Sequence, residues 1–378
     1  MSATALRERL ASLGGAPPAR PAPRPQRLTP AGFEEVTTPW GTALKRVEVI
    51  SSGRTPHGRR AGFGYLDTET TGLSGGTGTY VFAAALARPC GGGMEVIQLF
   101  LHEPGAEAAF LHALWEEVET CRAIATYNGA SFDLPLLRTR WVMARMPGEA
   151  AHPPHHDLLT LTRALWRHRL ESCTLRAVEE RLLDFEREGD IPGALIPATY
   201  LGYLRTGWHP DLEGTLEHNR QDVISLYHLH QRVLERMDGR DSIMDAADWL
   251  ALGRLLIRRR QRAAGWRALR HAAELREGTP SAQAAILLAR RLARRGAPAS
   301  AETLLGWVQE AIPADTGLTI ARARLLEWRL RRPAEALALV EAALAAGRHD
   351  QDLPRRHARL MLRVRRAEAG SRARGVSR

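Results

Sequence analysis

Two acidic residues have the types and spacing of a cation-binding pair. Asp67 and Glu69 stand two apart in the segment DTETTG, directly after a short apolar run. Side chains alternate between the faces of a β-strand, so both carboxylates are expected to point the same way. A divalent cation would relieve their repulsion, and hard oxygen ligands favour Mg²⁺ or Mn²⁺ over Zn²⁺. A solvated loop at a strand end is the alternative.

Two further segments favour the catalytic interpretation, because each adds an acid in a defined structural position. The segment YNGASFD ends at Asp133, where an expected strand gives way to an expected helix. The segment HNRQD places His218 and Asp222 four residues apart, which is one face of a helix. We therefore expect carboxylates from all three segments to form one site.

The three segments resemble the motifs of the DEDD superfamily of 3′-to-5′ exonucleases, which is named for four acids. In this sequence the four acids are Asp67, Glu69, Asp133 and Asp222. Longer stretches between about residues 60 and 237, including REGDIPGALIP, resemble YprB-type RNase H-like proteins, a bacterial branch that can carry tetratricopeptide repeats. The resemblance implies a metal-dependent nuclease that hydrolyses phosphodiester bonds of DNA or RNA, with 3′-to-5′ exonuclease activity.

The resemblance also implies a role for each side chain. The four acids would hold two cations, one that activates water and one that stabilises the leaving oxygen. His218 is the candidate to orient or deprotonate the water, because imidazole titrates near neutrality. In the histidine subclass the His stands five residues before the last Asp, a position that Glu217 fills here. A histidine that only supports the site is therefore an alternative.

Neighbours of the acids are the candidates for contact with substrate. They are Thr70, Asn128, Phe132 and Asn219. For Asn219, a hydrogen bond to a metal ligand and a cap on a polar face are equally good interpretations. Asp157 could be a further ligand, but an N-cap of the helix that starts at LLTLTRAL explains it at least as well.

The apolar pattern indicates which elements position these residues. Strand-like runs at 62–67, 79–87 and 94–101 precede a helix, a fourth strand and a second helix. More helices follow as far as about residue 237. This order predicts an α/β domain with a mixed sheet flanked by helices. The RNase H-like resemblance implies that the sheet has five strands.

The sequence divides into four parts. Residues 1–35 include a Pro/Arg-rich stretch and are predicted to be disordered, and residues 36–238 would form the RNase H-like domain. Ala/Leu/Arg-rich helices then recur at roughly 34 residues, the period of tetratricopeptide-like helix pairs. An all-α repeat domain is predicted over 239–368, with a surface that could bind a protein partner, and a basic tail over 369–378.

The composition of the chain indicates what kind of molecule it binds and in which cellular compartment it is expected. The net charge of +11 suits nucleic acid, although a general bias toward arginine would also produce it. No apolar run reaches the ~18 residues of a membrane span, and the N-terminus lacks the apolar core of a secretion signal. Three widely spaced cysteines disfavour a disulfide framework, so a cytoplasmic location is expected. Nothing indicates an organic cofactor.

Two other functions remain open. A structure-selective endonuclease could use the same fold, because fold alone does not distinguish cleavage at ends from cleavage within strands. A non-catalytic adaptor could grip nucleic acid with the front domain and bind a protein through the helical repeats. Such an adaptor would be free to lose the acids, and this sequence keeps all four.

Overall fold

A computed structural model describes most of the chain. The described residues are 27–51, 62–72, 77–146, 153–241 and 243–375. The chain forms two compact units, Met1–Leu158 with Glu186–Tyr227, and Leu159–Phe185 with His228–Arg378. The predicted disorder of residues 1–35 falls mainly on residues outside the described ranges. No described helix is long and apolar enough to cross a membrane.

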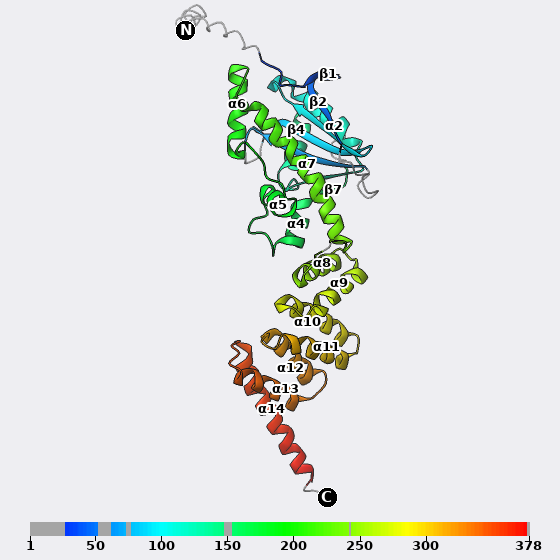
Figure 1. Cartoon of the computed structure of the whole chain (residues 1–378), viewed down its shortest axis with the longest axis vertical. Coiled ribbons are helices and arrows are strands. Elements are labelled where there is room, and N and C mark those ends of the chain that lie inside the picture. Colours follow the sequence, from blue (N-terminus) through cyan, green and yellow to red (C-terminus); the bar gives the residue numbers. More distant parts are fainter. Residues whose placement is uncertain (1–26, 52–61, 73–76, 147–152, 242, 376–378) are drawn as a thin grey trace, which may run out of the picture. The chain divides into compact units, whose positions relative to one another are not determined.

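A mixed sheet forms the centre of the first unit (Figure 1). Its strands are β1 (Glu34–Thr38), β2 (Gly41–Ser51), β3 (Phe63–Thr70), β4 (Val81–Cys90), β5 (Gly93–Phe100), β6 (Ala123–Thr126) and β7 (His155–Asp157). Their spatial order is β1-β2-β5-β4-β3-β6-β7. The pairs β3/β6 and β6/β7 are parallel and the others are antiparallel. The mixed α/β fold is confirmed.

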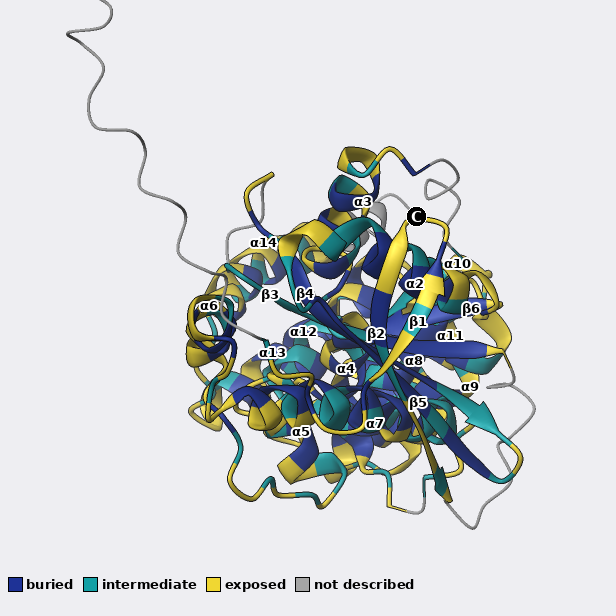
Figure 2. Cartoon of the chain, turned by 90° about the horizontal axis from the view of Figure 1, so that it is seen from above, coloured by how far each residue is buried: buried dark blue, intermediate teal, exposed yellow. Residues whose placement is uncertain are grey.

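The expected strand count of five is wrong, because the sheet has seven strands. The hairpin of β1 and β2 pairs with β5 and so extends one edge of the sheet. Its sequence hides this role, since the outer half of β2 is largely exposed and charged residues interrupt its apolar pattern. Figure 2 shows the inner strands of the sheet in dark blue, whereas β1 is mostly exposed.

Helices cover both faces of the sheet in the first unit. They are α2 (Glu107–Glu119), α3 (Asp133–Met143), α6 (Ile196–Thr206) and the first part of α7 (Leu212–Met237), with short 3-10 turns η2 (Pro104–Ala106) and η4 (Gly193–Leu195). Leu66 of β3 joins the buried cluster that includes α2 and α3. Tyr65 lies on the opposite face, where its ring centroid is 5.5 Å from that of Tyr227 in α7. Asp67 and Glu69 therefore share the α7 face.

The second unit is helical. It contains α4 (Leu158–Trp166), α5 (Leu175–Leu182), the end of α7, α8 (Ala246–Arg258), α9 (Arg262–Glu274), α10 (Gly278–Arg294), α11 (Pro298–Ala311), α12 (Thr316–Trp328), α13 (Pro333–Ala345) and α14 (Asp352–Gly375). Consecutive helices from α8 onward pack on one another, and α10 also packs on α8 and α12. Close packing needs small residues, since a Cβ on Gly253 of α8 would lie 2.8 Å from the Leu269 side chain of α9. The helix α14 continues into the segment predicted as a tail.

Candidate active site

The four predicted acids come from three elements of the first unit. Asp67 and Glu69 lie half-buried on the second half of β3, Asp133 is the first residue of α3, and Asp222 lies in α7. The pKa of Asp67 is raised well above its usual value, first by burial and then by the charges of the other three acids. Such mutual repulsion requires the four carboxylates to share one electrostatic environment.

The pKa values of two more acids, Glu69 and Asp133, are also raised. Burial and the charges of Asp222 and Asp133 raise the pKa of Glu69 well above its usual value. Burial raises the pKa of Asp133 to about 6, although the Thr68 hydroxyl donates a hydrogen bond of 2.6 Å to its Oδ1 and acts in the opposite direction. The site therefore disfavours ionised carboxylates unless positive charge is close to them.

These shifts give an expected pH dependence of stability in the presence of chelator. The folded state holds the Asp133 proton more tightly than an unfolded chain, in which the pKa is near 3.8. The free energy of unfolding should therefore fall as pH rises from about 4 to about 7, by up to about 3 kcal/mol. Thermal unfolding should show a flatter profile for Asp133→Asn, but not for Asp184→Asn, which removes an exposed charge. A wild-type protein that gains stability over this range would contradict the assignment.

The turn that leads into Asp133 is held by Asp157. Its Oδ1 accepts a hydrogen bond from the backbone N–H of Asn128 at 3.0 Å, and its Oδ2 accepts one from Ala130 at 3.4 Å. Asn128 has the left-handed φ of +66°, which an asparagine tolerates better than most residues. A Cβ on Gly129 would lie 2.2 Å from the Thr126 hydroxyl oxygen, so this position needs glycine. The carboxylate of Asp157 thus positions the turn.

Loss of the Asp157 carboxylate should displace the turn and the acid that follows it. Asp157→Ala removes two acceptors, so we expect the protein to lose about 1–3 kcal/mol of stability. We also expect a loss of any nuclease turnover in the range of roughly 10-fold to 100-fold, as for other groups that orient metal ligands. Asp157→Asn keeps one acceptor oxygen and should lie between Ala and wild type. Unchanged turnover in the Ala variant would show that the turn does not control Asp133.

A second group of charged residues joins the site from the segment REGD. Arg187 is only 6% exposed at its side chain, forms an ion pair with Asp222, and has its Nη1 3.5 Å from Asp190 Oδ2. His218 Nδ1 lies 2.7 Å from Asp190 Oδ1. The other ring nitrogen, Nε2, lies 3.9 Å from Asp222 Oδ2. A proton on Nδ1 would be donated to Asp190, which leaves the Nε2 lone pair on the side of Asp222.

The sequence did not single out Arg187 or Asp190 as site residues. Both belong to a stretch that carried the family resemblance, but that stretch has neither helical nor strand periodicity. Charged residues in such a stretch are usually solvated, and here both side chains are mostly buried. The expected placement of His218 and Asp222 on one face of a helix agrees with their contact in α7.

The residues expected to contact substrate differ in exposure. Phe132 is 57% exposed, whereas Thr70 and Asn128 are half-buried. Asn219 is fully buried, which is unsuitable for a substrate contact. Its Nδ2 donates a hydrogen bond of 2.9 Å to Asp67 Oδ2, and its Oδ1 accepts one of 3.4 Å from Gln98. Of the two roles considered for Asn219, the structure therefore shows the hydrogen bond to a candidate ligand.

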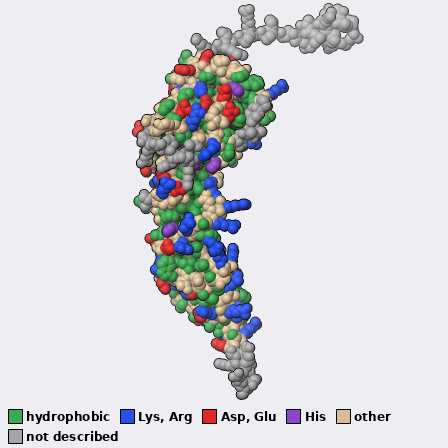
Figure 3. Space-filling model, turned by 90° about the vertical axis from the view of Figure 1, so that its right-hand side faces the viewer, with side chains coloured by type: hydrophobic (Ala, Val, Ile, Leu, Met, Phe, Trp, Pro, Cys, Tyr) green, Lys and Arg blue, Asp and Glu red, His purple; other side chains and the backbone are tan. Residues whose placement is uncertain are grey.

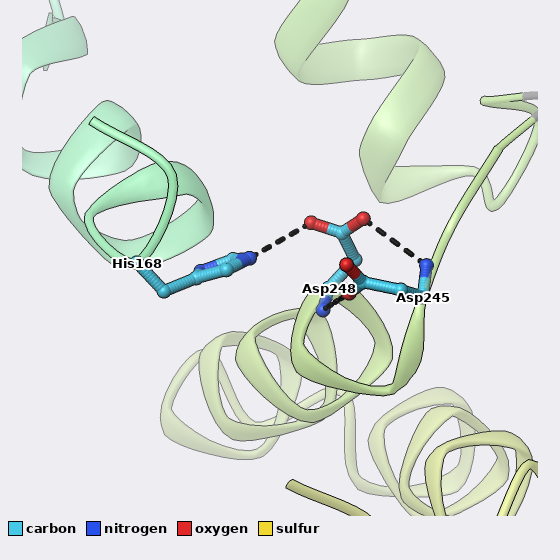
Figure 4. A group of neighbouring side chains, drawn as sticks. All are labelled: His168, Asp245 and Asp248. Carbon is cyan, nitrogen blue, oxygen red and sulfur yellow. Dashed lines mark hydrogen bonds and ion pairs between the residues drawn. The ribbon is translucent and has the colours of Figure 1, made fainter. Parts of the chain in front are cut away.

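The second unit holds a different cluster, formed by His168, Asp245 and Asp248 (Figure 4). Their possible ligand atoms lie within 4.8 Å of one another, and among the described residues the four acids of the first unit form no group as close as this. Burial opposes ionisation of Asp248, but hydrogen bonds from His168 and Arg169 and the charge of Arg236 hold its pKa well below the usual range. Three basic side chains already surround this carboxylate, so the cluster is a structural ion-pair network.

Comparison with known proteins identifies the fold of the first unit. Residues 64–234 match the RNase H superfamily, and this segment contains all four acids. The N-terminal part of the chain contains an RNase H-like domain. The uncharacterized protein YprB of Bacillus subtilis (strain 168) is 34% identical over 200 residues, which are 52% of this chain and 47% of that protein. The chain thus spans about half the length of this curated relative.

A solved structure with a weaker similarity is the family B DNA polymerase from the hyperthermophilic archaeon Pyrobaculum calidifontis. It has 17% sequence identity and a TM-score of 0.37, over 56% of this chain and 30% of the polymerase. The RNase H superfamily match identifies the fold of this domain, and nucleases of this fold generally use divalent metal ions.

Proposed function

We propose that the RNase H-like domain hydrolyses phosphodiester bonds of nucleic acid with two divalent cations, Mg²⁺ or Mn²⁺, and removes nucleotides from 3′ ends. The observation that supports this proposal is the convergence of four carboxylates whose charges oppose one another's ionisation. An acidic site of this kind fits hard cations, because they lower the free energy of the ionised carboxylates and prefer oxygen ligands. The same convergence has no evident use in folding alone.

The four carboxylates, Asp67, Glu69, Asp133 and Asp222, would hold the cations. When bound, the cations would supply the positive charge that activates water and stabilises the leaving oxygen. Asn219 orients Asp67 through its hydrogen bond, and Thr68 orients Asp133 in the same way. These contacts fix the ligands before substrate arrives, which reduces the reorganisation required during the reaction.

His218 is the proposed general base. When Nδ1 is protonated it donates to Asp190, which fixes the orientation of the ring so that Nε2 can accept a proton from water; Arg187 Nη1 also lies 3.2 Å from Nδ1. Asp190 is thus a positioning residue that acts through the histidine. Beside the acids, the exposed ring of Phe132 provides a surface on which a terminal base could stack, while Thr70 and Asn128 would contribute polar contacts.

The test uses single-stranded and duplex DNA and RNA, each labelled at the 5′ end or at the 3′ end. The full chain is incubated with Mg²⁺, Mn²⁺ or chelator, beside the Asp67→Ala/Glu69→Ala variant. We expect a ladder of stepwise shortened products from the 5′-labelled strand and early release of the label from the 3′-labelled strand. Internal fragments with the same metal dependence would instead indicate an endonuclease. Binding without cleavage of any substrate would favour the adaptor.

A further inference from the structure

The excess positive charge of the chain belongs to its helical repeats. Residues 246–369 contain 24 arginines against 12 aspartates and glutamates. Residues 1–245 contain 26 lysines and arginines against 30 aspartates and glutamates, so they are slightly acidic. A general compositional bias would act on both parts alike. Figure 3 shows the blue Lys and Arg side chains gathered over the helical part, whereas red and blue are mixed over the sheet-containing part.

A groove of about 490 Å³ between α10 and α12 concentrates this charge. Its arginines are Arg290, Arg294, Arg324 and Arg329, and no acidic residue of the described ranges lines it. All four are exposed, and within the described part of the chain none of them has an ion pair or a side-chain hydrogen bond. Elsewhere in the same unit arginines are paired, as Arg322 is with Glu302. The groove therefore offers several cationic groups without internal counter-charges.

An aromatic ring stands beside these arginines. Trp328 lines the groove and is 58% exposed. The guanidinium of Arg363 lies over its ring, 4.4 Å from the centroid. More than half of the Trp328 side chain nevertheless stays accessible to a ligand. Its position beside unpaired arginines resembles the combination of charge and stacking by which proteins hold unpaired nucleotides.

A second groove of about 620 Å³, formed by α9, α10 and α11, has the same composition. It is lined by Trp266, Trp307 and four arginines, with Glu274 as its single acidic residue. The recurrence of tryptophan with arginine at a second place argues that the repeats display this chemistry as a feature of the array. The groove between α10 and α12 is the more strongly cationic of the two, because none of its described lining residues is acidic.

We propose that the groove between α10 and α12 binds a single strand of nucleic acid, with arginines contacting phosphates and Trp328 stacking on a base. From the sequence the repeats could bind a protein partner or pack on themselves, with phosphate contact by their arginines as a weaker alternative, and the charge of the groove favours a polyanion. A single strand is favoured over a duplex because only an unpaired base presents its face to a tryptophan. This binding does not depend on the proposed nuclease activity, and it can be measured in chelator, where no metal-dependent cleavage occurs.

The test compares two triple variants of the full chain with equal loss of charge. The groove variant is Arg290→Gln/Arg294→Gln/Arg324→Gln. The control variant is Arg258→Gln/Arg259→Gln/Arg262→Gln, which changes exposed arginines that line neither groove. Binding of a fluorescent oligothymidylate is followed by anisotropy in chelator at several salt concentrations. Unchanged thermal unfolding confirms that the variants are folded.

We expect the groove variant to bind about tenfold more weakly at low salt and the control by less than about threefold. Three lost phosphate contacts should also reduce the slope of log K against log salt concentration by about 2. Trp328→Ala should weaken binding of oligothymidylate by roughly fivefold or more, but should not affect an abasic strand of equal length. Equal effects of the two triple variants would overturn the proposal. Binding of polyglutamate as tight as that of oligothymidylate would overturn it in favour of an acidic protein partner.

Discussion

Asp67→Asn/Glu69→Gln should lower the rate of nucleic-acid cleavage by at least about a thousandfold, without unfolding the protein. The two substitutions remove half of the proposed cation ligands, and cations in such sites contribute several kcal/mol of transition-state stabilisation. In chelator the same variant should be more stable than wild type, because it removes two carboxylates whose pKa values are raised by burial and by the neighbouring acids. Opposite effects on activity and stability are characteristic of a functional site.

Both quantities can be measured on one preparation, by single-turnover cleavage of a labelled strand and by thermal unfolding in chelator. The matched control is Glu186→Gln/Glu188→Gln, which removes two exposed carboxylates from the segment next to the site. We expect the control to keep wild-type activity within about threefold. If the Asp67/Glu69 variant were less stable in chelator and equally active, the two acids would be structural residues.

Arg187→Gln should destabilise the protein in chelator by about 3–5 kcal/mol, the usual effect of removing one partner from a buried ion pair. The guanidinium of Arg187 is ion-paired with Asp222 and Asp190, and its charge also lowers the pKa of Glu69. Without it, Asp222 and Glu69 would lose a positive charge beside them. Added Mg²⁺ should therefore raise the melting temperature of the variant by more than it raises that of wild type.

The control for this experiment is Arg187→Lys, which keeps the charge but loses the planar fork of the guanidinium. It should show a smaller loss of stability and a metal-induced shift closer to that of wild type. If Arg187→Gln responded to Mg²⁺ no more than wild type, Arg187 would not share an electrostatic site with the cations. The melting curves would then separate its structural role from its role beside the acids.

Features of the site that depend on local geometry could be predicted from the sequence. Strand alternation predicts that Asp67 and Glu69 share a face, and helical spacing predicts the same for His218 and Asp222. Both expectations agree with the structure. The hairpin of β1 and β2 was missed because the adjacent charged residues Lys45 and Arg46 interrupt the alternation that marks a half-buried strand, and the outer half of β2 is exposed.

Features that depend on tertiary packing could not be predicted in this way. Arg187 and Asp190 reach the site from an irregular segment, and no local pattern indicates that their side chains are buried against α7. For Asn219 the sequence left a substrate contact, a hydrogen bond to a metal ligand and a cap on a polar face open, and only the packing of α7 against the sheet shows that its amide donates to Asp67. The cationic groove between α10 and α12 likewise arises only when two helices separated in the sequence pack side by side and arginines of both line it.

Calorimetric titration of Mn²⁺ into the full chain would test the metal centre most directly. The samples are wild type, Asp67→Asn/Glu69→Gln, and His168→Gln/Asp245→Asn, a control that alters the other cluster of possible ligands. We expect wild type and the control to bind two ions alike, and the Asp67/Glu69 variant to lose this binding. Equal binding by the Asp67/Glu69 variant and wild type would contradict the assignment of the four carboxylates as the metal centre.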